Sequence, residues 1–125
     1  MLERLPDNPL PYTRREAAYA AMGDMRQARE ALLKALELSP GDPSSTMNLA
    51  QIERQRGNLD EVRRLYSEAL REHPGHLRIS LQLAQLEAEQ GEVEALVRLL
   101  NQAIERHPEA LEPRLILADY HLREN

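Results

Sequence analysis

The chain has 125 residues, and its 16 Lys and Arg against 21 Asp and Glu give a formal net charge of −5. This balance argues against nucleic acid or an anionic membrane as the main partner, and four Tyr without Phe or Trp leave few rings for base stacking. The absence of cysteine excludes disulfides, thiolate metal sites and a cysteine nucleophile. No apolar run approaches the roughly 18 residues of a membrane-spanning helix, so we expect no membrane insertion from this segment.

The elements predicted along the chain are all helices. After an extension at residues 1–8, apolar or small residues follow the spacing i, i+3, i+4, i+7 and i+8 of one helix face. The segment at 25–38 carries Ala28, Ala31, Leu32, Ala35 and Leu36 in this pattern, which then returns twice at a fixed distance. We predict helices at residues 13–22, 25–38, 44–56, 59–72, 78–90, 93–106 and 112–124.

Capping residues mark where these helices begin. Asp24 and Asn58 are good N-caps, whereas Glu92 at the third equivalent position is a poorer one. Asp42 followed by Pro43 predicts an N-cap and a proline in the first helical turn. Each unit is therefore expected to consist of a helix, a tight glycine turn, a second helix and a link that contains a proline.

The repeat has a fixed period, which the glycines and prolines measure. Gly23, Gly57 and Gly91 are 34 apart (57 − 23 and 91 − 57), and so are Pro40, Pro74 and Pro108. This helix-turn-helix period resembles the tetratricopeptide repeat family. The family's small residues fall on Ala50, Ala84 and Ala118 in the first helices and on Ala35, Ala69 and Ala103 in the second. The resemblance implies an all-α, right-handed α-solenoid over residues 9–125, with repeats at about 9–42, 43–76 and 77–110 and a half repeat at 111–125.

Three features depart from the family pattern. The tyrosine usual midway along the first helix occurs only as Tyr19, and Glu53 and Glu87 take its place in the next copies. Arg15 and Glu16 stand where an apolar and a small residue belong, so we expect helix 13–22 to be weakly packed. The fourth copy stops where a turn glycine is due, which predicts that the chain is a segment of a longer repeat protein.

The sequence contains few motifs that are typical of catalytic or metal-binding sites. The sequence has no phosphate-binding glycine loop, and no serine lies near a histidine with an orienting acid. His73 and His76 resemble a two-ligand metal motif, but no third ligand is evident. His73 and His107 instead share one repeat position at a helix C-terminus, where a cation suits the helix dipole. We predict no enzyme, no metal site and no cofactor.

The resemblance implies a binding groove, because the first helices of a tetratricopeptide array line its concave side. Carried over by position, the groove residues are Met47, Asn48, Gln51, Arg54, Gln55, Arg78, Leu81, Gln82, Gln85, Glu89, Leu115, Asp119 and Arg123. Met47, Leu81 and Leu115 form an apolar row that either contacts the partner or packs adjacent first helices. The amides, which donate and accept, suit a peptide backbone or sugar hydroxyls. Alternatively, Gln is simply a good helix former on a wet face.

Helix 112–124 is apolar over more than one face. A following helix would cover part of this surface in a continuing array, and an uncovered patch of this kind tends to find a partner. We therefore expect self-association, in a C2 arrangement, through Leu115, Ile116, Tyr120 and Leu122.

The sequence thus predicts a non-enzymatic scaffold for protein–protein interaction, with a protein or peptide partner and polysaccharide contact as a further option. Its Arg-, Ala- and Leu-rich texture, as in the stretch at 110–115, is similar to bacterial tetratricopeptide proteins of exopolysaccharide export and envelope assembly. That resemblance implies a segment of a larger envelope protein and favours the periplasm over the cytoplasm. The alternatives are an assembly or regulatory module of a cytoplasmic complex and a helical-repeat RNA binder, which the net charge disfavours.

Overall fold

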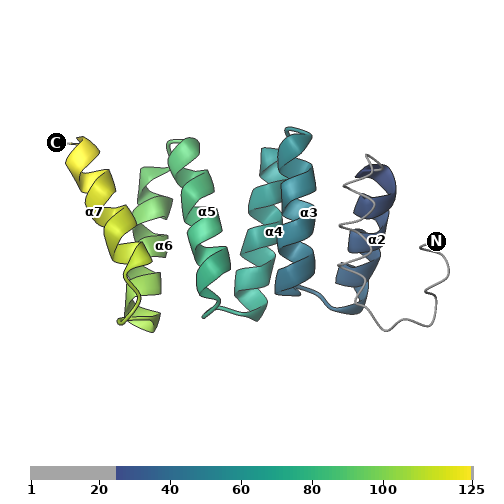
Figure 1. Ribbon diagram of the computed structural model, residues 1–125, viewed down its shortest axis with the longest axis horizontal. Coiled ribbons are helices and arrows are strands. Elements are labelled where there is room, and N and C mark those ends of the chain that lie inside the picture. The colour runs from purple at the N-terminus through teal and green to yellow at the C-terminus, as the bar shows by residue number, and fades with distance from the viewer. Residues whose placement is uncertain (1–24, 125) are drawn as a thin grey trace, which may run out of the picture.

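The computed structural model describes residues 25–124, which form six α-helices and no β-strand (Figure 1). They are α2 (Met25–Leu38), α3 (Pro43–Gln55), α4 (Leu59–Glu72), α5 (Leu77–Glu89), α6 (Val93–Arg106) and α7 (Glu112–Glu124). Four helices have the predicted bounds, and α3 and α5 begin and end one residue earlier than expected. The helix expected at 13–22, with Gly23 and Asp24, lies outside the described residues. The prediction of an all-α repeat fold is confirmed.

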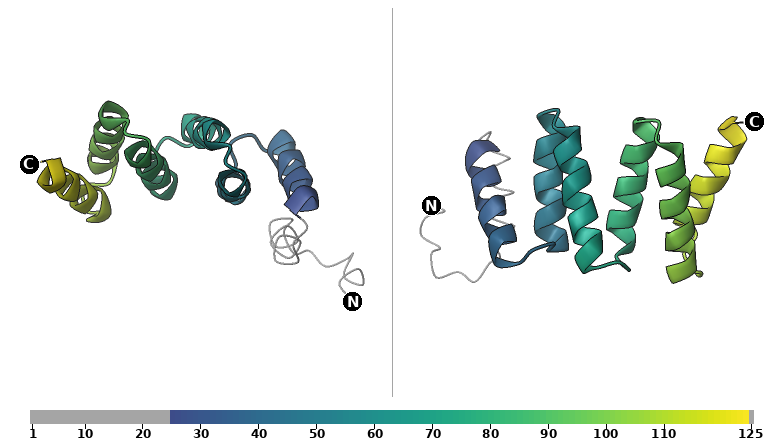
Figure 2. Two further views of the ribbon diagram at one scale, coloured as in Figure 1. Left: turned by 90° about the horizontal axis from the view of Figure 1, so that it is seen from above. Right: turned by 180° about the vertical axis from the view of Figure 1, so that it is seen from behind.

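The helices are arranged in two layers. Seen from above, α3, α5 and α7 lie along one side, and α2, α4 and α6 lie along the other (Figure 2). Each helix packs against the helices next to it in sequence, so the array grows along one direction. The first helix of every repeat thereby shares a single face of the molecule, here called the A face, formed by α3, α5 and α7.

The turns within the repeats depend on glycine. Gly57, between α3 and α4, has a φ of 81°, and Gly91, between α5 and α6, has a φ of 75°. This left-handed conformation is strained for residues with a Cβ atom, which explains why glycine returns at this turn in each repeat. The prediction of a tight glycine turn between the two helices of each repeat is confirmed at these two positions.

The capping predictions had different outcomes. The backbone N–H of Ser45 donates to Asp42 Oδ2 over 2.9 Å, and Pro43 occupies the first turn of α3, as expected. Asn58 occupies the N-cap position of α4, as predicted, but its side chain makes no capping hydrogen bond. Its amide instead donates to Glu53 Oε1 over 2.9 Å, because a buried carboxylate requires donors. Glu92 makes no side-chain cap either, consistent with its poorer rank.

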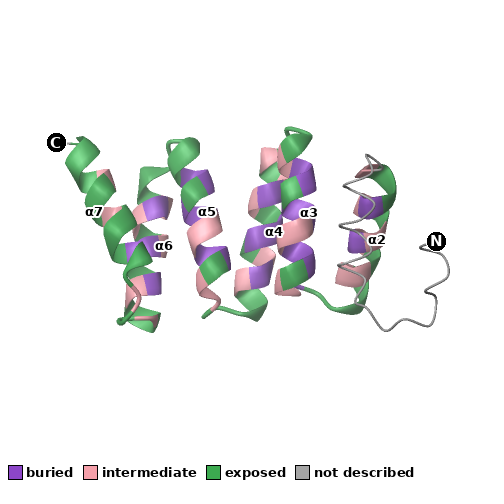
Figure 3. Cartoon of the chain, in the orientation of Figure 1, coloured by how far each residue is buried: buried purple, intermediate pink, exposed green. Residues whose placement is uncertain are grey.

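The core is formed by residues from both layers, and buried positions recur along α2 to α6 (Figure 3). Its largest cluster joins α2, α3, α4 and α5, and a smaller one joins α5 and α6 to the inner side of α7. The largest fully buried apolar side chains are Leu32, Leu49, Ile79, Leu86, Leu96, Leu100 and Val62. In α7 only Pro113 is buried, so the described array is packed least tightly at this helix.

Candidate functional site

The apolar row on the A face is not uniform. Met47 is half-buried and packs against the larger core cluster, and Leu81 is half-buried against the smaller one. Leu115 is 62% exposed. Met47 and Leu81 are therefore used largely for packing within the array. Most of the Leu115 side chain remains free to contact a partner.

The amides of the A face have unused hydrogen-bonding capacity. Gln51, Gln55 and Gln85 are exposed, and Asn48 and Gln82 are half-buried. Within residues 25–124, none of these five side chains has a hydrogen-bond partner. Each carries two N–H donors and a carbonyl acceptor, so the cluster can bind groups that both donate and accept.

Charged groups on the A face are largely paired within the chain. Arg54 Nη1 donates to Glu89 Oε1 over 2.8 Å and so connects α3 with α5. On α7, Arg123 Nε lies 3.1 Å from Asp119 Oδ2. Arg78 is exposed and pairs with no acidic group among the described residues. Four of the predicted groove residues thus form two ion pairs with one another. The amides are uncharged polar side chains of the A face that remain available to a partner.

A buried carboxylate lies between the repeats, at the position where the sequence departs from the family tyrosine. Glu53 is 0% exposed. Arg29 Nε of α2 donates to its Oε2 over 2.6 Å, and Arg56 and Asn58 donate to its Oε1. Burial by itself raises the pKa of Glu53, but these hydrogen bonds and the charges of Arg29 and Arg56 outweigh it and lower the pKa below its ordinary value.

The same pairing recurs one repeat later. The guanidinium of Arg63 on α4 donates to both carboxylate oxygens of the buried Glu87 on α5, with a shortest distance of 2.8 Å. Hydrogen bonding to Glu87 raises the pKa of Arg63. Val97 and His121 stand at the next equivalent positions, so this arginine–glutamate pairing ends at the junction of α6 with α7.

Sequence reasoning missed these pairs, although their signal was present. Arg29 and Arg63 are separated by one repeat period (63 − 29), as are Glu53 and Glu87 (87 − 53). Two opposite charges that recur with the repeat on consecutive helices indicate a contact between repeats. Such pairs fix how neighbouring helices align, and they contribute to the A face by holding its helices in place.

Two of the histidines make structural contacts. His76 Nδ1 accepts from the backbone N–H of Ile79 at the start of α5, over 3.2 Å. His107 Nε2 lies 2.7 Å from the carbonyl oxygen of Gly75. Within residues 25–124, no three His, Asp or Glu side chains are grouped to hold a metal ion, and the motif at His73 and His76 has no third ligand there. No helix in this part of the chain is long and apolar enough to cross a membrane.

The outer side of α7 is apolar and exposed. Leu122 is 76% and Ile116 37% exposed, and Leu115 belongs to the same helix. Tyr120 is only half exposed, because it packs with Leu117 against the core cluster of α5 and α6. Three of the four residues expected to mediate self-association are therefore accessible, and the fourth mainly anchors α7 to the array.

Helix hairpins that repeat with a fixed period and stack in two layers define an α-solenoid. Two tetratricopeptide repeat family profiles match the sequence, at residues 18–76 and 53–109. The chain belongs to the tetratricopeptide repeat family. This membership indicates a scaffold for protein–protein interaction.

Solved structures support the same fold. A tetratricopeptide repeat protein from Parabacteroides merdae is similar over 80% of this chain and 40% of its own, with 29% identity and a TM-score of 0.68. A substituted form of MamA is similar over 90% of this chain and 66% of its own, with 17% identity and a TM-score of 0.63. The chain thus spans less than two thirds of either protein. No curated protein sequence matches it.

Proposed function

We propose that the chain is a non-enzymatic scaffold whose A face binds a segment of a partner protein. The observation that carries this proposal is the set of five amide side chains on α3 and α5 without partners in the described chain. In an extended peptide, every backbone N–H and C=O needs a partner once it leaves water. A row of amides supplies both kinds of partner without requiring a charged ligand.

The pairs around this row favour a rigid surface. Arg54 and Glu89 tie α3 to α5 on the A face itself, and the buried pairs of Glu53 and Glu87 tie each first helix to the preceding repeat. A surface that is already ordered loses less conformational entropy when it binds. Leu115 supplies the accessible apolar contact, and its full burial contributes on the order of 1.5–3 kcal/mol.

The wider biological setting is part of the proposal. The Arg-, Ala- and Leu-rich composition supports a segment of a larger bacterial envelope or polysaccharide-export protein in the periplasm. There the same amides also suit sugar hydroxyls. An assembly module of a cytoplasmic complex would use the A face in the same way. An RNA partner is the weakest alternative, because a net charge of −5 opposes phosphate binding.

Site-specific photocrosslinking tests which face the partner contacts. A photoreactive residue replaces Gln85 on the A face in one variant and Arg98, exposed on α6 in the other layer, in the matched control. We expect one discrete crosslinked protein from position 85, whose yield falls when unlabelled wild-type chain competes, and none from position 98. Equal crosslinking from both positions would contradict the proposal.

A second candidate function is self-association through α7. Leu115, Ile116 and Leu122 are exposed on one helix, and a two-fold arrangement brings this patch against its own copy. Such a contact is isologous and closed, so it produces dimers rather than filaments. It leaves the amides of α3 and α5 accessible.

A further inference from the structure

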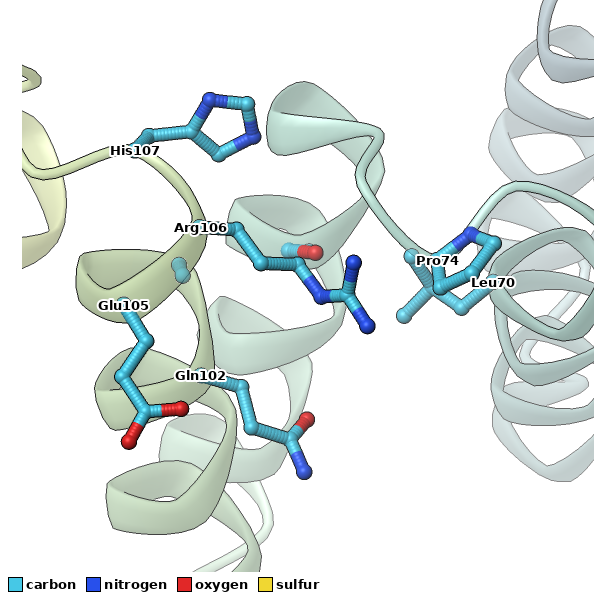
Figure 4. A pocket seen from close by; sticks show the side chains of 8 residues that line it. Leu70, Pro74, Gln102, Glu105, Arg106 and His107 are labelled. Atoms are coloured by element: carbon cyan, nitrogen blue, oxygen red, sulfur yellow. The ribbon is translucent and has the colours of Figure 1, made fainter.

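A hollow of about 360 Å³ lies between the C-terminal ends of α4 and α6 and the first turn of α5. Leu70 and Pro74 form one wall, and Gln102 and Arg106 of α6 form the opposite wall (Figure 4). The guanidinium of Arg106 and the amide of Gln102 extend toward Leu70 and Pro74, whereas the carboxylate of Glu105, which also lines the hollow, points along α6. The hollow therefore combines an apolar wall with a cationic and polar one.

The polar groups of this wall have no partner in the described chain. Within residues 25–124, Arg106 makes no ion pair or hydrogen bond, and the side chain of Gln102 makes no hydrogen bond. By contrast, His107 is held by its contact with the carbonyl of Gly75, and Ser80 donates to the carbonyl of His76. The two unpaired side chains offer several N–H donors toward one space, the arrangement that a carboxylate accepts.

The same junction one repeat earlier has a different lining. Four lining residues have like counterparts there, namely Leu36, Pro40, Ala69 and His73, whereas Thr46, Glu68, Arg71 and Glu72 stand in place of Ser80, Gln102, Glu105 and Arg106. A Cβ atom added to Gly41 would lie only 2.6 Å from Cγ of Glu72, so the Glu72 stem rests on that glycine. A Cβ atom at the corresponding Gly75 would have nothing within 4 Å.

Three of the four substitutions favour an open, anion-accepting space at the second junction. The smaller Ser80 replaces threonine, and the acidic positions 68 and 72 become Gln102 and Arg106. No side-chain stem lies against Gly75 in the way that the Glu72 stem lies against Gly41. The fourth substitution adds the acidic Glu105, whose carboxylate points along α6 and not across to the apolar wall (Figure 4). The two junctions share the same helix arrangement, so the cationic and polar wall of the hollow comes from these substitutions.

We propose that this hollow binds a glutamate side chain of a partner protein. The methylene stem packs on Leu70 and Pro74, and the carboxylate accepts hydrogen bonds from Arg106 and Gln102. A single cation suits one carboxylate, and the nearby Glu105 disfavours a doubly charged phosphate. The site is separate from the amides of the A face, so the failure of either proposal leaves the other intact.

Nuclear magnetic resonance titration of the full chain tests this site. The probes are the blocked tripeptide acetyl-Gly-Glu-Gly-amide, its Gln counterpart and the free dicarboxylate glutarate. We expect saturable shifts of the Gln102 side-chain amide and the Arg106 Nε–H with the Glu peptide, and at least ten-fold weaker binding of the uncharged Gln peptide. Arg106→Gln should weaken binding of the Glu peptide at least ten-fold, whereas Arg98→Gln, an exposed change on the same helix, should leave it unchanged.

Three results would overturn the proposal. Non-saturating shifts in the wild type would mean no site, and equal affinities for Arg106→Gln and Arg98→Gln would mean general surface attraction. Glutarate bound ten-fold more tightly than the Glu peptide would assign the hollow to a small dicarboxylate instead of a partner side chain. Because Arg106 is exposed, its substitution should leave backbone shifts outside the end of α6 unchanged, which separates loss of binding from loss of folding.

Discussion

Arg29 Nε lies 2.6 Å from Glu53 Oε2, and this contact joins the second helix of one repeat to the first helix of the next. Arg63 and Glu87 make the same contact one repeat period later (63 − 29 and 87 − 53). Each carboxylate is buried, so it needs its donors to remain charged inside the array. Because these pairs recur with the sequence repeat, they hold α3 and α5, the helices of the A face, in a fixed position against the preceding repeat.

Loss of the Glu53 charge should destabilise the array. Glu53→Gln removes the partner of Arg29 and Arg56, and we expect the free energy of unfolding to fall by about 1–3 kcal/mol. Glu89→Gln is the matched control, since it breaks an exposed pair between helices and should change the free energy by less than about 1 kcal/mol. Urea unfolding followed by circular dichroism measures both. Equal effects of the two changes would contradict the structural role of Glu53.

The Glu53 contribution should also depend on pH. Its pKa is lowered in the folded chain, so between that value and the ordinary value of about 4.3 the unfolded state binds more protons. The contribution is therefore complete above the ordinary value and is lost as the pH falls through the folded-state pKa. In unfolding measured from pH 7 to pH 3, the difference between wild type and Glu53→Gln should shrink as the pH falls below the ordinary value. A difference between them that stays constant over this range would contradict the lowered pKa.

The helices were predictable because their signals are local and repeated. Apolar periodicity, the glycines at 57 and 91 and the cap at Asp42 act within a few residues, so the sequence was sufficient to place six helices within one residue. The role of Asn58 was not predictable in this way, because it depends on the burial of Glu53 by a neighbouring repeat. Likewise, the pairing of Arg54 with Glu89 and the opening beside Gly75 depend on how consecutive repeats stack.

Self-association should depend on the exposed side of α7. Ile116→Glu with Leu122→Glu places two charges in the apolar patch, and we expect this double variant to remain monomeric where the wild type forms dimers. Sedimentation velocity over a range of concentrations measures the difference, with Glu94→Ala and Arg98→Ala on α6 as a control that should still dimerise. A wild type that stays monomeric at high concentration would eliminate this second candidate function.

Binding at the A face is tested most directly by isothermal titration calorimetry. The partner segment that crosslinking identifies is titrated into the wild type and into two triple variants, and the affinities are compared. Gln51→Ala, Gln55→Ala and Gln85→Ala remove the exposed amides of the A face, whereas Ser67→Ala, Glu94→Ala and Arg98→Ala change exposed residues of the other layer. At a net loss of about 0.5–1.5 kcal/mol per hydrogen bond, the first variant should bind at least ten-fold more weakly. Both variants should keep the helical content of the wild type. We expect the second to bind like the wild type; an unchanged affinity of the amide variant would contradict binding at the A face.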